Sequence, residues 1–141
     1  MIIQQVSVFL ENKSGRLTDV TAKLSAGSIN LVALTIAETS DYGVVRMIVS
    51  NPDGAVKALK EEGFAVSLTE VLCLSVPNQP GALHRTLKIL SDADISIEYL
   101  YAFSLDEKAL AVIRCENINR AIDVLTEHKM ELIKASKLYS I

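Results

Sequence analysis

Apolar residues follow two different spacings along the chain, and the spacings alternate. Residues 2–10 are apolar with polar interruptions, which is typical of a strand. Leu17, Val20 and Leu24 then recur at helical spacing before Gly27, and glycine is a common residue just after a helix. The pattern therefore predicts a strand followed by a helix that ends near residue 27.

The next apolar segments predict a hairpin. Residues 29–37 and 44–49 are rich in branched side chains, and the polar and glycine-containing segment 39–43 separates them. Asn51 then supplies a helix N-cap and Pro52 a first helical residue. Two strands and a second helix are expected.

A second helix and a long strand complete this half of the chain. Ala55, Val56 and Leu59 form the apolar stripe of the helix, which is expected to end at Gly63. Residues 64–68 begin a strand that is predicted to continue through residues 69 and 70 into residues 71–76.

The whole pattern returns after a shift of 66 residues, which indicates an internal duplication. Many other pairs keep their apolar character, such as Met47 with Ile113. The identical pairs are Asn12 with Asn78, Gly15 with Gly81, Leu17 with Leu83, Leu24 with Leu90, Ser25 with Ser91, Ile29 with Ile95, Leu34 with Leu100, Asn51 with Asn117, Ala55 with Ala121, Leu59 with Leu125, Glu61 with Glu127, and Leu72 with Leu138.

The second half therefore predicts the same elements as the first. Helices are expected over the stripes at 83–90 and 121–125, a hairpin over 95–103 and 109–115, and a closing strand over 130–140. The order βαββαβ is that of the ferredoxin-like fold, an α+β fold in which both helices lie on one face of an antiparallel sheet. We expect two such domains, at residues 1–70 and 71–141.

The second strand of each half is predicted to lie at a sheet edge. Residues 31–37 and 95–103 are nearly continuously apolar, and an uncovered edge of this kind favours aggregation. A domain of about 70 residues is also marginally stable alone, because it buries only about 60% of its unfolded surface. The two copies are therefore predicted to pair side by side through these strands, giving one eight-stranded antiparallel sheet with helices on one face.

Composition and charge exclude several classes of partner. The 141 residues are 50% hydrophobic and 22% charged, with a formal net charge of -3. The chain has no excess of positive charge with which to bind phosphates, so neither nucleic acid nor an anionic membrane is expected as a partner. The apolar runs are too short for a membrane helix, and no basic leader is seen. A cytoplasmic protein is expected, with Cys73 and Cys115 as buried, reduced thiols.

Three functions known on this fold lack their residues here. The strands at 43–49 and 109–115 carry no aromatic platform for RNA, and neither first loop has the Cys-x-x-Cys pair of a metal carrier. Arg16 and Asn30 match an acylphosphatase pair, but no glycine-rich cradle accompanies them. No nucleophile with an adjacent base is found, so no catalytic residue, metal or cofactor is predicted and the protein is not expected to be an enzyme.

The loop that leads into the first helix of each half is the candidate binding element. It reads Asn-Lys-Ser-Gly-Arg-Leu at 12–17 and Asn-Gln-Pro-Gly-Ala-Leu at 78–83. Free amides at a helix N-terminus favour a carboxylate, glycine permits close approach, and asparagine offers both a donor and an acceptor. These features suit a free amino acid. Asparagine and glycine also form ordinary turns, an alternative that a single loop would favour, but the loop occurs twice at equivalent positions.

The pattern Asn-x-Pro-Gly-x-Leu, an apolar helix, and Ile-Asn/Ser before an apolar strand resembles the ACT domain, a small regulatory module of amino-acid metabolism. With the duplication, the resemblance covers essentially the whole chain. It implies a ferredoxin-like fold, side-by-side pairing of domains, and regulation in place of catalysis. It also implies that amino acids bind between the first loop of one domain and the second strand of its neighbour.

The resemblance places the ligand in two unequal sites. Ser14 stands where the second loop has Pro80, and Ser96 stands where the first half has Asn30. The site with Asn78, Gly81 and Asn30 is expected to be the more ordinary one, and Glu98 in the other site is a candidate for the ligand ammonium or for a basic side chain. The residues implied are Asn12, Ser14, Gly15, Arg16, Leu17, Asn30, Leu31, Val32, Asn78, Gln79, Pro80, Gly81, Ala82, Leu83, Ser96, Ile97 and Glu98.

The sequence thus predicts a non-catalytic regulatory module. It is expected to bind a free amino acid at the interface between its two ACT-like domains and to transmit occupancy to a partner protein, for which an amino-acid-metabolism enzyme is the candidate. A homodimer is expected. The alternative that remains open is a ligand-free structural or regulatory subunit of such an enzyme.

Overall fold

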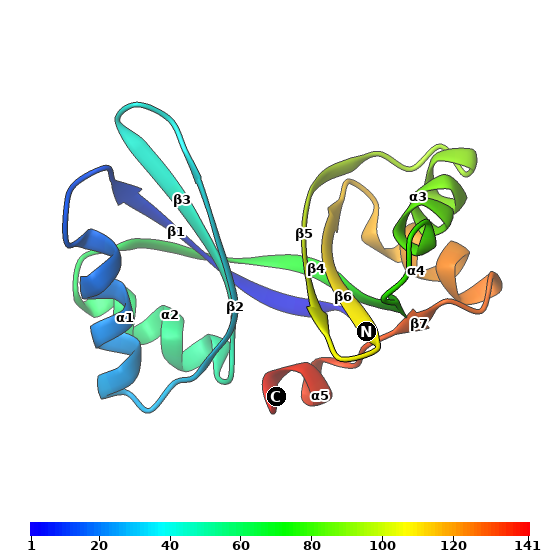
Figure 1. The fold of residues 1–141 in the computed structure, drawn as a ribbon. Coiled ribbons are helices and arrows are strands. Elements are labelled where there is room, and N and C mark those ends of the chain that lie inside the picture. The colour runs from blue at the N-terminus through cyan, green and yellow to red at the C-terminus, as the bar shows by residue number, and fades with distance from the viewer. The chain divides into compact units, whose positions relative to one another are not determined.

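The chain forms two compact units that exchange their terminal residues. The computed structural model describes residues 1–141, except for the side chain of residue 105. The N-terminal unit consists of Gln4–Thr69 with Ser136–Ile141, and the C-terminal unit consists of Met1–Ile3 with Glu70–Ala135. Figure 1 shows the elements in the order of the chain.

The N-terminal unit is a sheet with two helices. Its strands have the order β2-β3-β1-β4, and β3 pairs antiparallel with both β1 and β2. The elements are β1 (Ile3–Glu11), α1 (Arg16–Ala26), β2 (Leu31–Glu38), β3 (Tyr42–Val49), α2 (Pro52–Glu61) and the first part of β4 (Ala65–Pro77).

The C-terminal unit repeats this order of elements. The second part of β4 takes the place of the first strand, and the strand order is β7-β4-β6-β5. The elements are α3 (Ala82–Asp92), β5 (Ile97–Leu105), β6 (Lys108–Cys115), α4 (Ile118–Glu127) and β7 (Glu131–Leu132), and a short helix α5 (Ala135–Tyr139) follows.

Alternate residues of the strands pack against the helices and form one core in each unit. In the N-terminal unit Val6, Val8 and Leu10 of β1 lie in the same buried cluster as Val20 of α1 and Leu59 of α2. The C-terminal unit has a matching cluster built from Leu72, Leu74, Val76, Leu90, Ala121 and Leu125. Neighbouring residues of a strand point to opposite faces of the sheet, so the alternate buried positions share one face. Both helices of a unit cover that face.

The predicted continuous strand is confirmed as β4, which passes from one unit into the other without a turn. The expected edge-to-edge pairing and the eight-stranded sheet are corrected. The described chain has seven strands, in which β2 pairs only with β3 and β5 only with β6. The cause lies in residues 68–71, which contain no glycine or proline to break the strand, so β4 serves both copies.

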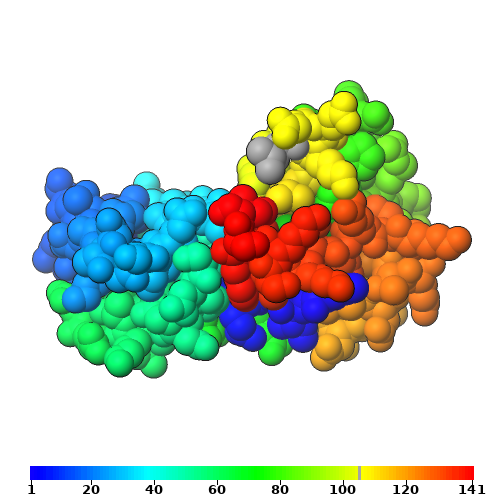
Figure 2. All heavy atoms as spheres, turned by 90° about the horizontal axis from the view of Figure 1, so that it is seen from below, coloured from blue at the N-terminus to red at the C-terminus, as the bar shows by residue number. Residues whose placement is uncertain are grey.

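The last segment was expected as a strand over residues 130–140, and only β7 has that form. From Ala135 the chain is the helix α5, in which Leu138 is completely buried. Ala135 and Leu138 lie three residues apart, a helical spacing, whereas the alternation of a strand stops at Leu132. The Tyr139 hydroxyl accepts a hydrogen bond from the Gln4 amide at 2.8 Å. Figure 2 shows this end of the chain in red.

The predicted caps and the predicted burial of the cysteines are confirmed. The Asn51 side chain accepts from the Gly54 amide at 3.1 Å and the Asn117 side chain from the Arg120 amide at 3.1 Å. Cys73 and Cys115 are free thiols with no exposed surface. Burial in the apolar interior raises the pKa of Cys73 to about 12.

Both cysteines are expected to resist alkylation in the folded chain at about pH 8, because the thiolate is the reactive form and burial disfavours it. Mass spectrometry after treatment with iodoacetamide measures this. Denaturation in guanidinium should expose both thiols to modification. Rapid modification of Cys73 in the native protein would contradict its burial.

Leu138→Ala is expected to lower the free energy of unfolding by about 2–5 kcal/mol, because it leaves a cavity beneath α5. Ile141→Ala is the matched control, since Ile141 is 51% exposed in the same terminal segment, and it should change stability little. Urea unfolding followed by circular dichroism measures both, and equal effects would show that α5 is not docked.

Candidate functional site

The two candidate loops have the same backbone conformation. Gly15 precedes α1 with φ 88° and ψ -11°, and Gly81 precedes α3 with φ 86° and ψ -10°. This left-handed conformation costs other residues about 1–2 kcal/mol. The adjacent hairpin fixes each loop, because the Asn12 amide donates to Asp41 O at 3.0 Å and the Asn78 amide to Glu107 O at 2.8 Å.

Each loop leaves helix amides without an acceptor. The Asp19 amide donates to Gly15 O at 2.9 Å and the Arg85 amide to Gly81 O at 3.0 Å, but neither helix start has a side-chain cap. Within the described chain, no acceptor is found for the amides of Leu17, Thr18, Leu83 and His84. Unpaired amides at a helix N-terminus attract anions such as a carboxylate.

The two loop asparagines differ in what their side chains leave available. Asn12 Nδ2 donates to Ser40 O at 3.3 Å, and its Oδ1 accepts from no described residue. Asn78 Nδ2 donates to Asp106 O at 3.4 Å, while its Oδ1 accepts from Ser104 Oγ at 3.4 Å. The acceptor oxygen is therefore open in the first loop and in use in the second.

Arg16 is held mainly by its own helix and by the core. Its guanidinium carbon lies 4.6 Å from the centre of the Phe64 ring, and Nη1 lies 3.6 Å from Asp19 Oδ2. Its Nε is buried without a hydrogen-bond partner. In the structure the predicted loop residue Arg16 thus faces Phe64, although it also borders a hollow beside the loop.

The predicted strand residues lie at matching bulges. In β2 the register changes between Leu31 and Ala33, so Val32 is the extra residue; in β5 it changes between Ile97 and Tyr99. Bulges redirect side chains and are common beside functional sites. Asn30 and Ser96 precede these bulges and are exposed, and the Asn30 amide donates to Ser50 Oγ at 2.9 Å.

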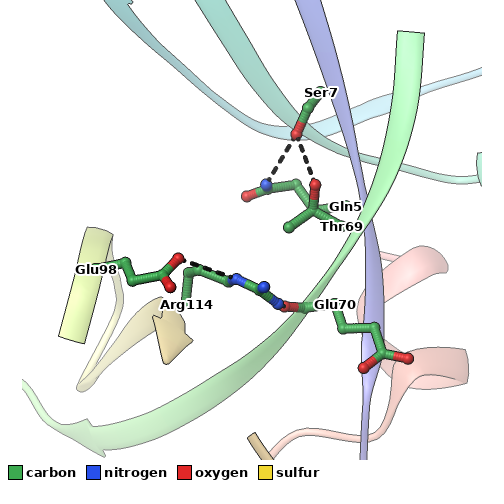
Figure 3. A network of polar contacts seen from close by, with 6 residues as sticks. All are labelled: Gln5, Ser7, Thr69, Glu70, Glu98 and Arg114. Atoms are coloured by element: carbon green, nitrogen blue, oxygen red, sulfur yellow. Dashed lines mark hydrogen bonds and ion pairs between the residues drawn. The ribbon is translucent and has the colours of Figure 1, made fainter. Parts of the chain in front are cut away.

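Glu98, the extra residue of the second bulge, has a partner that the sequence did not reveal. Arg114 Nε lies 3.2 Å from Glu98 Oε2, and Arg114 Nη1 donates to Glu70 O at 2.8 Å. Figure 3 shows Arg114 between these two groups. A ligand ammonium at Glu98 must compete with this guanidinium. The one signal in the sequence was a charged residue inside the apolar strand 109–115.

Two buried polar residues of β1 were also missed. Gln5 is fully buried and donates from Nε2 to Ser7 Oγ at 3.2 Å, and Ser7 Oγ lies 3.2 Å from Thr69 Oγ1. Their signal was the alternation of polar residues within the segment 2–10. These bonds satisfy polar groups on the sheet face that the helices do not cover.

The predicted site residues divide between the units. Residues 12–17 and 30–32 belong to the N-terminal unit, and residues 78–83 and 96–98 to the C-terminal unit. A site that combines a loop of one unit with a strand of the other stays a prediction. The described residues contain no cluster of three or more His, Cys, Asp or Glu fit for a metal ion. None of the described helices is long and apolar enough to cross a bilayer.

Gly15→Ala and Gly81→Ala are each expected to destabilise the protein by about 1–2 kcal/mol, because alanine resists positive φ. No neighbour lies within 4 Å of a Cβ added at Gly15, so the effect there is conformational. Gly27→Ala is the control, since φ at Gly27 is -86°, and it should not destabilise. Thermal melting measures all three, and a similar result for Gly15 and Gly27 would contradict the left-handed loop.

Known proteins similar to this chain were found among solved structures. No curated protein matches the chain. The crystal structure of protein BT0572 from Bacteroides thetaiotaomicron is similar over 100% of this chain and 98% of that one, with 51% identity and a TM-score of 0.97.

Two more distant structures share the fold. The ligand-free regulatory subunit of aspartate kinase from Thermus thermophilus is 11% identical with a TM-score of 0.65, over 90% of this chain and 94% of that one. A structure of aspartokinase alpha and beta subunits is 15% identical with a TM-score of 0.59, over 89% and 95%. The model of the ACT domain pair matches residues 1–141, and the protein belongs to this family.

Proposed function

We propose that the protein is a regulatory module that binds a free amino acid between two ACT-like domains, at residues 1–70 and 71–141, and passes the bound state to a partner protein. The main observation in support is the pair of loops with left-handed glycines and unpaired helix amides. Two such loops at equivalent places, in a member of the ACT domain pair family, favour a binding role over two ordinary turns.

The proposed sites combine elements of both units. The second loop, with Asn78 and Gly81, acts with Asn30, and the first loop, with Asn12 and Gly15, acts with Ser96. The ligand carboxylate binds the free helix amides, and the ammonium binds side-chain oxygens. Occupancy then favours the domain arrangement that holds the ligand better, by no more than the difference in affinity between arrangements.

An amino-acid-metabolism enzyme is the proposed partner. Structures of similar fold are described as the regulatory subunit of aspartate kinase, which supports a role of this kind. A homodimer is also proposed. The free edge of β2 carries Leu34 and Ile36, which are 38% and 44% exposed, and an apolar edge strand favours pairing with another strand.

A ligand-free subunit is the second candidate. The observation in its favour is the bond from Ser104 to Asn78 Oδ1, which engages the acceptor that a ligand would need. In that case the loops only close the ends of the two sheets.

Calorimetric titration of the full chain with each of the twenty free amino acids tests the proposal. We expect one or a few to bind, and Asn78→Ala or Asn30→Ala to weaken binding by about tenfold, since each removes a hydrogen bond to a charged group. Asn119→Ala, at an exposed position of α4, is the control and should bind normally. No heat from any amino acid at saturating concentration would favour the ligand-free subunit.

A further inference from the structure

The sheet face of the N-terminal unit that its helices leave uncovered carries two exposed aromatic rings. Val8 and Leu10 of β1 lie in the core, so Phe9 between them points to the opposite face. Tyr42 of β3 lies on that face as well, because it pairs with Glu11, which is two residues from Phe9 on β1. Phe9 and Tyr42 are each 59% exposed. The two rings are diagonal neighbours, within reach of one another for side chains of this size.

Smaller apolar side chains extend this surface across the sheet. Phe9 pairs with Val44, and Val44 pairs with Ala37, so the three form one row across β1, β3 and β2. The next row along the strands is polar and consists of Ser7, Arg46 and Thr35. We refer to the exposed apolar surface as the outer patch, which consists of Phe9, Ala37, Tyr42 and Val44.

The corresponding face of the C-terminal unit is buried. At the shift of 66 residues, Phe9 corresponds to Ser75 and Val44 to Leu110, which are 4% and 7% exposed. Cys73, in the next row, has no exposed surface. The C-terminal unit therefore uses this face for packing, whereas the outer patch leaves the same face open in the N-terminal unit.

Charges of opposite sign lie at the two ends of the outer patch. Glu11 stands beside Tyr42 at one end, and Arg46 follows the row of Phe9 at the other end. The ion pair of Glu11 with Lys13, at 2.8 Å, engages only Oε2 of the carboxylate. A two-fold axis parallel to the row of Phe9 exchanges the two ends, so Glu11 and Tyr42 of one copy face Arg46 of a second copy. Opposite charges and a guanidinium on an aromatic ring both attract, so the patch is complementary to itself.

We propose that the outer patch is a docking surface for a second copy of the chain, with the sheets of two N-terminal units stacked face to face. Phe9 of each copy meets Phe9 of the other near the axis, in the offset or edge-to-face geometry that aromatic pairs prefer. Stacked sheets of this kind lie about 10 Å apart. The contact uses the face of the sheet, whereas the homodimer proposed above uses the edge of β2, and it needs no bound amino acid.

The size of the outer patch makes this association weak and dependent on concentration. Since a fully buried aromatic side chain loses about 150–250 Å², the four rings of a pair, each 59% exposed, lose about 350–600 Å² together. A stable interface buries about 1,200–2,000 Å² in total. The rings supply roughly a third of that area, and the aliphatic and polar residues around them supply the rest.

Cross-linking of the full chain tests the geometry. Val44→Cys places a thiol near the proposed axis, on a strand inside the sheet and away from the β2 edge. A short bis-maleimide is expected to join two copies there. Cys73 and Cys115 are buried and should not react. Ser25→Cys, at an exposed position of α1, is the matched control and should give no dimer on a denaturing gel.

Sedimentation over a range of protein concentrations tests the contacts. Phe9→Ser should raise the dissociation constant about tenfold, because it removes an aromatic anchor from the centre of the interface. Leu68→Ser is the control, since Leu68 is 38% exposed on β4 outside the outer patch, and it should associate normally. Glu11→Arg should weaken association, and Arg46→Glu in the same chain should restore it, because opposite charges then face each other again. Circular dichroism verifies that each variant is folded.

The outcomes separate this contact from the other proposals. A Val44→Cys cross-link that Phe9→Ser abolishes supports the stacked sheets, and an absent cross-link, or one that Phe9→Ser leaves unchanged, overturns them. Association that Ile36→Ser weakens and Phe9→Ser does not assigns the homodimer to the β2 edge and overturns the docking face. A monomer at every concentration overturns both contacts and leaves amino-acid binding standing, since calorimetry measures it separately.

Discussion

A strand without an interruption determines the organisation of this protein. The first part of β4 is the last strand of the N-terminal unit, and its second part is the first strand of the C-terminal unit, with no turn between the two parts. Because a strand has two edges and two faces, one continuous backbone can support a core on each side of residue 70. β4 thus contributes Val66 to the cluster of the N-terminal unit and Leu72, Leu74 and Val76 to that of the C-terminal unit.

The local elements could be predicted because their signals are local. The apolar period of Val6, Val8 and Leu10, the caps at Asn51 and Asn117, and the glycine before each first helix depend only on nearby residues. The form of the last segment could not be predicted in this way. Its apolar residues fit a strand as well as a helix over a few positions, and the burial of Leu138 decides between them.

The candidate site shows the same limit. The duplicated loops were visible in the sequence because asparagine, glycine and leucine recur at equivalent positions of both halves. The partner of Glu98 was not visible, since pairing with Arg114 depends on the register of β5 on β6 and on the bulge at residue 98. Nor was the position of Arg16 over Phe64, which joins residues almost fifty positions apart in the chain. Which side chains meet across a sheet depends on the register of its strands, and amino-acid composition does not determine that register.

The exchange of terminal residues has a consequence for biosynthesis. The N-terminal unit includes Ser136–Ile141, so the half of the protein that leaves the ribosome first lacks part of its packing until these residues have been synthesised. The nascent chain must hold Gln4–Thr69 in an incomplete state while the other unit is made. Completion of the N-terminal unit therefore waits for one late event, the arrival of Leu138 and Tyr139.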